Sequence, residues 1–255
     1  MGELDGQVAI VTGASRGIGR ALAIGLADAG AGVVCAARTE VESPGGLPGT
    51  IHTTAAAIRE RGGHALAVRC DIGSGEDITA LVDATVAEFG QLDALVNNAM
   101  APTRAAFTDS TADQWDESMR VNVRSLFLTC KAVMGPMVER GGGSVINVSS
   151  GAADPRLTVG LPPGYLTYSV AKAAMERFST AIAGELAPFN IAVNAMRPGA
   201  VKTEHATHEL GADYDWTGWG PPEAVVPAVV FLASQRADGV TGRIVDSTQF
   251  GVTWP

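Results

Sequence analysis

The sequence has little charge and few cysteines, and each shortage narrows what the protein can be. Charged residues make up 18% of the 255 residues, and the formal net charge is −9. A protein that binds a nucleic-acid backbone needs clustered Lys and Arg, so this balance argues against one. Cys35, Cys70 and Cys130 are odd in number, follow no Cys-x-x-Cys spacing and each sit in an apolar stretch. We interpret them as small core residues of a protein kept in a reducing compartment.

Long apolar runs are also missing. No run of about 18 apolar residues occurs, so the sequence predicts no membrane-spanning helix. The first residues lack the basic and apolar regions of a signal peptide, and we therefore expect a cytoplasmic protein. The hydrophobic fraction is nevertheless 46%, which suggests that apolar surface is buried between subunits.

Short β-branched runs alternate with Ala-rich amphipathic stretches along the whole chain. The runs predict strands at Val8–Thr12, Gly32–Ala37, Ala65–Cys70, Ala94–Asn97, Val145–Ser149, Ile191–Met196 and Ile244–Asp246. Between them, helices are predicted at Gly17–Ala29, Thr50–Arg61, Gly75–Phe89, Thr111–Arg140, Tyr165–Leu186 and Pro222–Ala233. This alternation predicts one α/β domain over residues 1–255, a doubly wound parallel sheet of about seven strands with helices on both faces.

Three segments look like additions to this frame: Glu42–Gly49, Asp154–Gly164 and Thr203–Pro221. All three follow predicted strands, and open α/β sheets bind ligands at the carboxyl ends of their strands. We therefore expect them to border the functional site, with residues 200–221 covering a substrate.

The first predicted strand runs into a glycine-rich turn and then into a helix. The turn, Gly13–Gly19, has the spacing Gly-x-x-x-Gly-x-Gly. Bare backbone lets a pyrophosphate approach closely, and the amides at a helix N-terminus point at its charge. The sequence therefore predicts a dinucleotide site in a Rossmann-type fold.

Tyr168 and Lys172 form a second pattern. Four residues apart on a helix, their side chains project from the same face. A phenol has an ordinary pKa near ~10, and a cation within ~4–6 Å brings that pKa toward the working range. The pair therefore indicates a proton donor and acceptor next to the nucleotide site.

With Thr12 in front of the turn, these patterns resemble the short-chain dehydrogenase/reductase family. The resemblance covers nearly the whole chain and rests also on Asn97-Asn98-Ala99, Asn122, Ser150 and Pro198-Gly199, in that order. It implies an oxidoreductase that interconverts a ketone and a secondary alcohol with a nicotinamide cofactor. It also implies a homotetramer or dimer in which the helices at 111–140 and 165–186 pair across subunits.

The resemblance implies roles for four residues. Tyr168 would be the general acid in reduction, and Lys172 would lower the pKa of Tyr168 and hold the nicotinamide ribose. Ser150 would donate a hydrogen bond to the carbonyl oxygen, and Asn122 would hold a water that links Lys172 to solvent. Ser149 is the alternative to Ser150, because adjacent residues on an extended segment face opposite ways.

The cofactor type is predicted from the end of the second strand. An acidic residue there would bind the ribose hydroxyls of NAD, but the chain has Ala37 followed by Arg38. With Arg16 as a second guanidinium, this favours NADP(H), with NAD(H) possible and Glu40 or Glu42 as carboxylates that could neutralise the arginines. The implied cofactor contacts are Gly13, Ser15, Arg16, Gly17, Ile18, Gly19, Arg38, Asp71, Ile72, Asn98, Ala99, Tyr168, Lys172, Pro198, Gly199, Val201 and Thr203.

Several departures from the family pattern bear on the substrate. Met100 replaces the usual Gly, the loop between Ser150 and Tyr168 is long, and Asp246-Ser247-Thr248 replaces Asp-Gly-Gly. The stretch at 48–51, where the added segment Glu42–Gly49 ends, resembles an insertion in hydroxysteroid-dehydrogenase-like members. Three interpretations of the aromatic residues of the covering loop stay open: they form a wall over the substrate, pack within the loop, or contact another subunit. These residues are Tyr214, Trp216 and Trp219. Together with Met100 they favour a small to medium apolar ketone.

Other readings of the chain stay open. His205 and His208 have His-x-x-His spacing, but without further ligands we predict no metal site and expect one of them to touch substrate. A non-enzymatic NADP(H)-binding regulatory protein would share the fold, whereas a sugar-nucleotide epimerase needs a larger C-terminal region. An acyl-carrier ketoreductase would need a basic docking patch, and Arg104, Arg156 and Lys202 are scattered.

Overall fold

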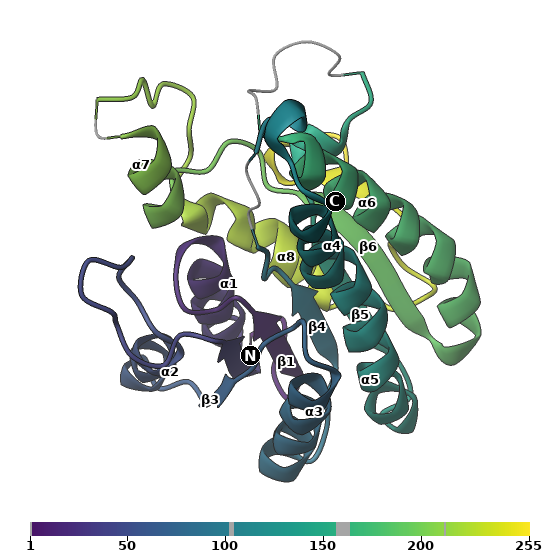
Figure 1. The fold of residues 1–255 in the computed structure, drawn as a ribbon. Helices are drawn as coiled ribbons and strands as arrows, with labels where there is room; N and C mark the ends of the chain where they lie inside the picture. The colour runs from purple at the N-terminus through teal and green to yellow at the C-terminus, as the bar shows by residue number, and fades with distance from the viewer. Residues whose placement is uncertain (1, 102–104, 157–163, 212) are drawn as a thin grey trace.

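Seven parallel strands form one sheet in the order β3-β2-β1-β4-β5-β6-β7. The computed structural model describes residues 2–101, 105–156, 164–211 and 213–255 (Figure 1). The strands are β1 (Val8–Thr12), β2 (Gly32–Ala37), β3 (Ala65–Arg69), β4 (Ala94–Asn97), β5 (Gly143–Val148), β6 (Ile191–Arg197) and β7 (Ile244–Asp246). Because the strand order reverses between β1 and β4, a crevice is expected at their carboxyl ends. The predicted doubly wound sheet is confirmed.

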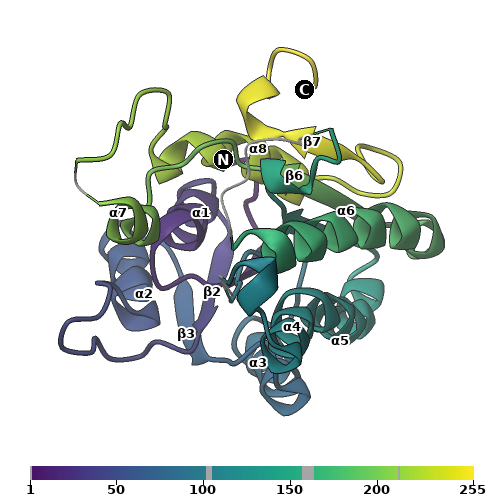
Figure 2. The same ribbon diagram turned by 45° about the horizontal axis from the view of Figure 1, so that its top comes forward.

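Helices cover both faces of the sheet, as Figures 1 and 2 show from two sides. They are α1 (Gly17–Asp28), α2 (Ile51–Glu60), α3 (Gly75–Phe89), α4 (Ala112–Met119), α5 (Ser125–Glu139), α6 (Leu166–Leu186), α7 (Glu204–Leu210) and α8 (Val226–Ala233). Helices α1, α2 and α8 pack on one face, and α3, α5 and α6 pack on the other.

The core consists of two apolar layers, one on each side of the sheet. Within β2, Val33 and Cys35 belong to one layer and Val34 to the other, because successive side chains of a strand point to opposite faces. The three cysteines are buried, as predicted, and burial raises the pKa of each thiol to about 12.

The structure departs from the predicted elements in two places that matter for the site. The helix predicted over Thr111–Arg140 is interrupted by a π-helical turn at Arg120–Arg124, between α4 and α5. The backbone stays helical through a π-helical turn, so the periodic patterns on its two sides still predict helix over the whole range.

The segment predicted as a loop over Thr203–Pro221 contains helix α7. The Thr203 hydroxyl caps it by accepting from the Ala206 amide at 3.1 Å. Of the long loop Asp154–Gly164, residues 157–163 lie outside the described residues, as does Arg104.

Candidate active site

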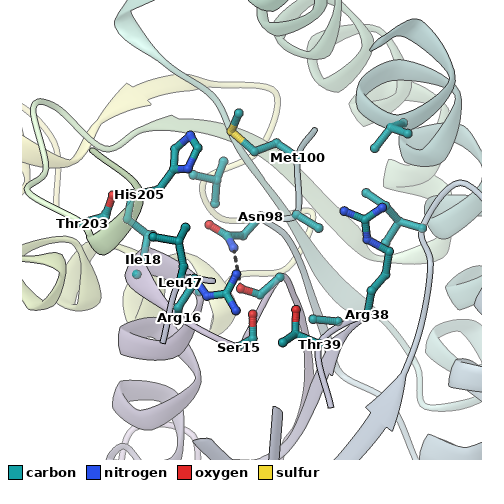
Figure 3. Close-up of a pocket in the computed structure, with 18 of the residues that line it drawn as sticks. Ser15, Arg16, Ile18, Arg38, Thr39, Leu47, Asn98, Met100, Thr203 and His205 are labelled. Atoms are coloured by element: carbon teal, nitrogen blue, oxygen red, sulfur yellow. Dashed lines mark hydrogen bonds between the residues drawn. The ribbon is translucent and has the colours of Figure 1, made fainter. Parts of the chain in front are cut away.

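The glycine turn, the ends of several strands and the start of α6 line one cleft of about 370 Å³. All of the predicted cofactor contacts line this main cleft except Gly199 and Val201. Figure 3 shows Asn98 and Met100 beside the turn, with Thr203 and His205 from the α7 segment across from them. Ser150 and Asn122 do not line the main cleft, whereas Ser149, the alternative to Ser150, does.

The glycine turn is packed too tightly for side chains. A Cβ on Gly19 would lie 2.2 Å from the Gly13 carbonyl oxygen and 2.5 Å from Asn98 Nδ2. The side-chain Nδ2 of Asn98 donates to the Thr12 carbonyl oxygen at 3.0 Å, and the backbone N–H of Asn98 donates to the Thr12 hydroxyl oxygen at 3.0 Å. Asn98 therefore holds the turn that the sequence pattern assigned to cofactor binding.

The start of α1 is suited to an anion. Among the described residues no side chain caps this helix, and its first turn carries no acidic residue. Its first amides are thus left for a ligand, and a dinucleotide pyrophosphate fits their charge and the bare glycine backbone. Arg16, Gly17 and Ile18 from this turn all line the main cleft.

Arg16 is engaged with the insert formed by Glu42–Gly49. Its Nε donates to the Pro48 carbonyl oxygen and its Nη2 donates to the Gly49 carbonyl oxygen, both at 2.9 Å. The Glu42 carboxylate accepts from the Gly49 amide at 2.7 Å, so it is turned to the insert as well.

Arg38 stands apart from Arg16. In Figure 3, Ser15 and Thr39 lie between the two arginines, which therefore do not converge. Glu40, the other carboxylate considered from the sequence, lies 3.4 Å from His52 Nε2. Arg38 is thus the guanidinium of the main cleft next to the end of β2.

Tyr168 and Lys172 lie together on α6, with Lys172 Nζ 5.8 Å from the centre of the Tyr168 ring. Lys172 is buried, and its ammonium donates to the Val148 carbonyl oxygen at the end of β5, at 2.6 Å. Burial lowers the pKa of Lys172 to about 8, and the nearby Glu176 carboxylate opposes that change. Lys172 is therefore an ammonium at neutral pH that holds its proton less tightly than an exposed lysine does.

The two candidate serines have different surroundings. Ser149 is buried, and its hydroxyl donates to Glu176 Oε1 at 2.8 Å. Ser150 is partly exposed, and its Oγ accepts from the Ala152 amide at 3.1 Å, which leaves the hydroxyl hydrogen for another acceptor.

Asn122 lies in the π-helical turn and is buried. Its Oδ1 accepts from the Ala101 amide at 3.0 Å, and its Nδ2 donates to the Ala101 carbonyl oxygen at 2.9 Å. The side chain thus fixes the backbone next to Met100, which lines the main cleft.

A side groove of about 660 Å³ opens beside the main cleft, between the insert and α7. Leu47, Thr203 and Glu204 line both spaces. Glu204 Oε2 is buried and has no hydrogen-bond partner among the described residues, and it would lie 3.5 Å from a Cβ on Gly17. A carboxylate therefore stands beside the helix start that suits a pyrophosphate.

Sequence reasoning missed Glu176 and Arg197, which lie near Lys172 and Ser149. Arg197, the last residue of β6, donates to both carboxylate oxygens of Glu176, at 2.7 and 2.8 Å. Glu176 stands four residues after Lys172, and this spacing on a predicted buried helix was the signal that could have identified it.

Neither a metal cluster nor a membrane-spanning helix is found in the described part of the chain. No three His, Cys, Asp or Glu side chains there gather to hold a metal ion. His205 Nε2 lies 3.1 Å from Glu209 Oε1, and His208 lines the side groove rather than the main cleft. Likewise, no described helix is long and apolar enough to cross a bilayer.

Comparison with known proteins gives consistent matches. The family described as short chain dehydrogenase matches residues 7–213. Cyclopentanol dehydrogenase of Comamonas sp. is 35% identical over 95% of this chain and 95% of its own. A 3-oxoacyl-[acyl-carrier-protein] reductase of Synechocystis is 33% identical over 95% and 96%. A short chain dehydrogenase from Burkholderia cenocepacia, solved in complex with NADP, superposes with a TM-score of 0.82 at 28% identity, covering 96% of this chain and 97% of its own.

Proposed function

The chain belongs to the short-chain dehydrogenase/reductase family, and from this premise we propose that it is an NADP(H)-dependent carbonyl reductase or alcohol dehydrogenase. The observation that carries the proposal is that Tyr168 and Lys172 line the same cleft as the glycine turn. The proposed substrate is a small to medium, largely apolar ketone or the matching secondary alcohol.

The proposed chemistry divides between cofactor and chain. A bound nicotinamide supplies a hydride to the carbonyl carbon. The Tyr168 phenol gives its proton to the carbonyl oxygen, so that the product is a neutral alcohol and the phenolate remains. The Lys172 ammonium one helical turn away stabilises that phenolate. The Ser150 hydroxyl donates to the same oxygen as negative charge develops on it.

The cofactor preference is proposed from Arg38. A guanidinium at the ribose end binds a 2′-phosphate through charge-assisted hydrogen bonds, and the solved relative with bound NADP agrees with this choice. Arg16 supports binding less directly, because two of its nitrogens are bonded to the insert.

The apolar substrate preference is supported by Met100 and by the aromatic cluster that follows α7. The Tyr214, Trp216 and Trp219 rings have centroid separations of 5.0 to 5.8 Å, and the cluster lies in the segment proposed to cover the substrate. Cyclopentanol dehydrogenase, by its name, acts on a small apolar alcohol.

A homotetramer in the cytoplasm belongs to the same proposal. The subunit contact is supported by three exposed apolar side chains, Trp115 on α4 and Phe127 and Val138 on α5. Light scattering on the purified protein measures the subunit number directly.

The acyl-carrier ketoreductase remains a second candidate, because a relative carries that name. Two of the three basic residues considered for docking are engaged elsewhere. Arg156 donates to the Asp154 carboxylate, and the Lys202 ammonium lies 4.8 Å from the Trp216 ring centre. A free ketone reduced faster than a β-ketoacyl thioester of equal size favours the first proposal.

The decisive experiment titrates NADPH and NADH against the protein by fluorescence and follows oxidation of each with a panel of neutral ketones. Tyr168→Phe is expected to lower turnover by about 10²–10⁴-fold with unchanged NADPH affinity. The matched control is Tyr165→Phe, whose ring lies 5.9 Å from that of Tyr168 and which is expected to keep its activity. Tight NADPH binding without turnover of any ketone would instead favour a cofactor-binding regulatory protein.

A further inference from the structure

The ion pair between Glu176 and Arg197 joins α6 to the carboxyl end of β6 and, through Asp154, to the segment that follows β5. Glu176 on α6 is 5% exposed, and both of its carboxylate oxygens accept from the Arg197 guanidinium. Arg197 closes β6 and precedes Pro198, which lines the main cleft. Its Nη1 also donates to Asp154 Oδ2 at 3.2 Å, in the segment that follows Ser150.

The same carboxylate decides which serine hydroxyl is held inside the protein. Glu176 Oε1 accepts from Ser149 Oγ as well as from Arg197 Nε. With Ser149 turned to Glu176, the next residue, Ser150, points the other way along the extended backbone.

Glu176 also acts on Lys172, one helical turn before it on the buried face of α6. Lys172 faces Tyr168 and Glu176 from its own helix and the Val148 carbonyl from β5, with Arg197 of β6 and Asp154 beyond Glu176. Glu176 raises the pKa of Lys172 against the lowering by burial. A negative charge at this distance from a buried ammonium therefore keeps the ammonium protonated at higher pH.

We propose that Glu176, held by Arg197, is a positioning residue for the reaction: it holds the hydroxyl of Ser149, at the wall of the main cleft, and supplies the negative charge that sustains the Lys172 ammonium. This inference deepens the proposed function and rests on it. Glu176 touches neither substrate nor cofactor in this scheme and acts through Ser149 and Lys172.

Lys172 can be observed without any substrate. The lysines of the chain are Lys131, Lys172 and Lys202, so ¹³C-lysine NMR gives a simple spectrum in which Lys172→Arg assigns one signal. We expect Glu176→Gln to lower the pKa of Lys172 by about one pH unit, because a neighbouring negative charge is lost. Arg197→Gln is expected to raise it, because a nearby positive charge is lost, whereas Glu176→Asp keeps the charge and leaves the pKa near that of the parent.

A matched control separates positioning from mere stabilisation. Asp93 is another buried carboxylate that bonds to arginine, 1% exposed and 3.2 Å from Arg140 Nε. It precedes β4, at the amino end of the strands, whereas Arg197 lies at the carboxyl end of β6. Asp93→Asn is expected to lower the melting temperature like Glu176→Gln and to leave the Lys172 pKa unchanged. In turnover, Glu176→Gln is expected to reduce kcat with unchanged KM for NADPH, and Glu176→Asp to retain most of kcat.

Glu176→Gln and Arg197→Gln are expected to shift the pKa of Lys172 in opposite directions, and this difference tests the proposal. If Glu176→Gln and Arg197→Gln both leave the Lys172 pKa in place, or move it in the same direction, the proposal is wrong and the ion pair only stabilises the fold. If Glu176→Gln does not fold, Arg197→Gln alone still tests the sign. Absence of ketone reduction by the parent protein would overturn the proposed function, while the NMR titration would still decide the electrostatic coupling.

Discussion

The adjacent hydroxyls of Ser149 and Ser150 go to different partners: Ser149 donates to a buried carboxylate on α6, whereas Ser150 accepts from a backbone amide two residues on. The sequence alone left the choice between them open. Ser149 lines the main cleft, but its hydroxyl hydrogen is given to Glu176, whereas among the described residues no acceptor takes that of Ser150. The hydrogen bonds therefore favour Ser150 as the donor to a substrate oxygen.

Replacing the two serines in turn tests that assignment. We expect Ser150→Ala to lower kcat by about 10²–10³-fold, the loss typical of one donor to a developing oxyanion. Ser149→Ala is expected to reduce kcat much less and to cost about 1 kcal/mol of the free energy of unfolding, because a buried hydrogen bond is lost. Steady-state kinetics and urea unfolding give both quantities. A larger kcat loss in Ser149→Ala than in Ser150→Ala would reverse the roles.

The separation of Arg16 from Arg38 predicts different effects on cofactor affinity. Arg38→Ala is expected to weaken NADPH binding by about 1.5–3 kcal/mol and to leave NADH binding nearly unchanged, because the lost hydrogen bonds are those to the 2′-phosphate. Arg16→Ala is expected to weaken both cofactors alike, since it releases the insert whose Pro48 and Gly49 carbonyls it binds. Fluorescence titrations measure the four affinities. A selective loss of NADPH affinity in Arg16→Ala would show that Arg16 also binds the phosphate.

Glu204 predicts a substitution that tightens cofactor binding. Its buried carboxylate stands beside the start of α1, where the phosphates of a dinucleotide would be repelled by it. Glu204→Gln is expected to lower the Kd for NADPH severalfold, by roughly 0.3–1 kcal/mol, with a smaller gain at high salt. Glu223→Gln is the control, because Glu223 lines only the side groove. Weaker binding in Glu204→Gln would mean that the carboxylate supports the helix start instead.

Lys172 predicts a specific pH dependence of stability. Its pKa is about 8 in the folded protein against an ordinary 10.5, so between these pH values the unfolded state binds more protons. The contribution of Lys172 to the free energy of unfolding therefore rises with pH across this window. Urea unfolding of the parent and of Lys172→Met from pH 7 to pH 10.5 measures it, with the difference expected to shift in favour of the parent as pH rises. A constant difference would show that Lys172 keeps an ordinary pKa in the fold.

Much of the architecture was predictable because parallel strands buried on both faces are apolar throughout. The ranges for β1, β2, β4 and β7 agree with the structure, and β3 ends one residue earlier than predicted. The α7 helix was missed because it is only seven residues long and none of its residues is buried, so no apolar periodicity announces it.

Most of the residues predicted for the site lie around one cleft, but the contacts between them were not predictable. Motif order brought the glycine turn, Asn98, Tyr168 and Lys172 to one cleft. It could not indicate that Arg16 bonds to an insert more than thirty residues further along, since that contact depends on how Pro48 and Gly49 fold back. The Glu176–Arg197 pair was equally hidden, because pairing between a helix and a strand end depends on the packing of α6 against β6.

Leu47 lines both the main cleft and the side groove, so its side chain helps to separate the two spaces. Thr203 and Glu204 line both spaces as well, so Leu47→Ala is expected to thin the wall between the two spaces and to leave those two residues in place. Tyr168 and Lys172 line only the main cleft, so a change at Leu47 leaves their surroundings on α6 as they are and alters the side-groove wall of the cleft alone.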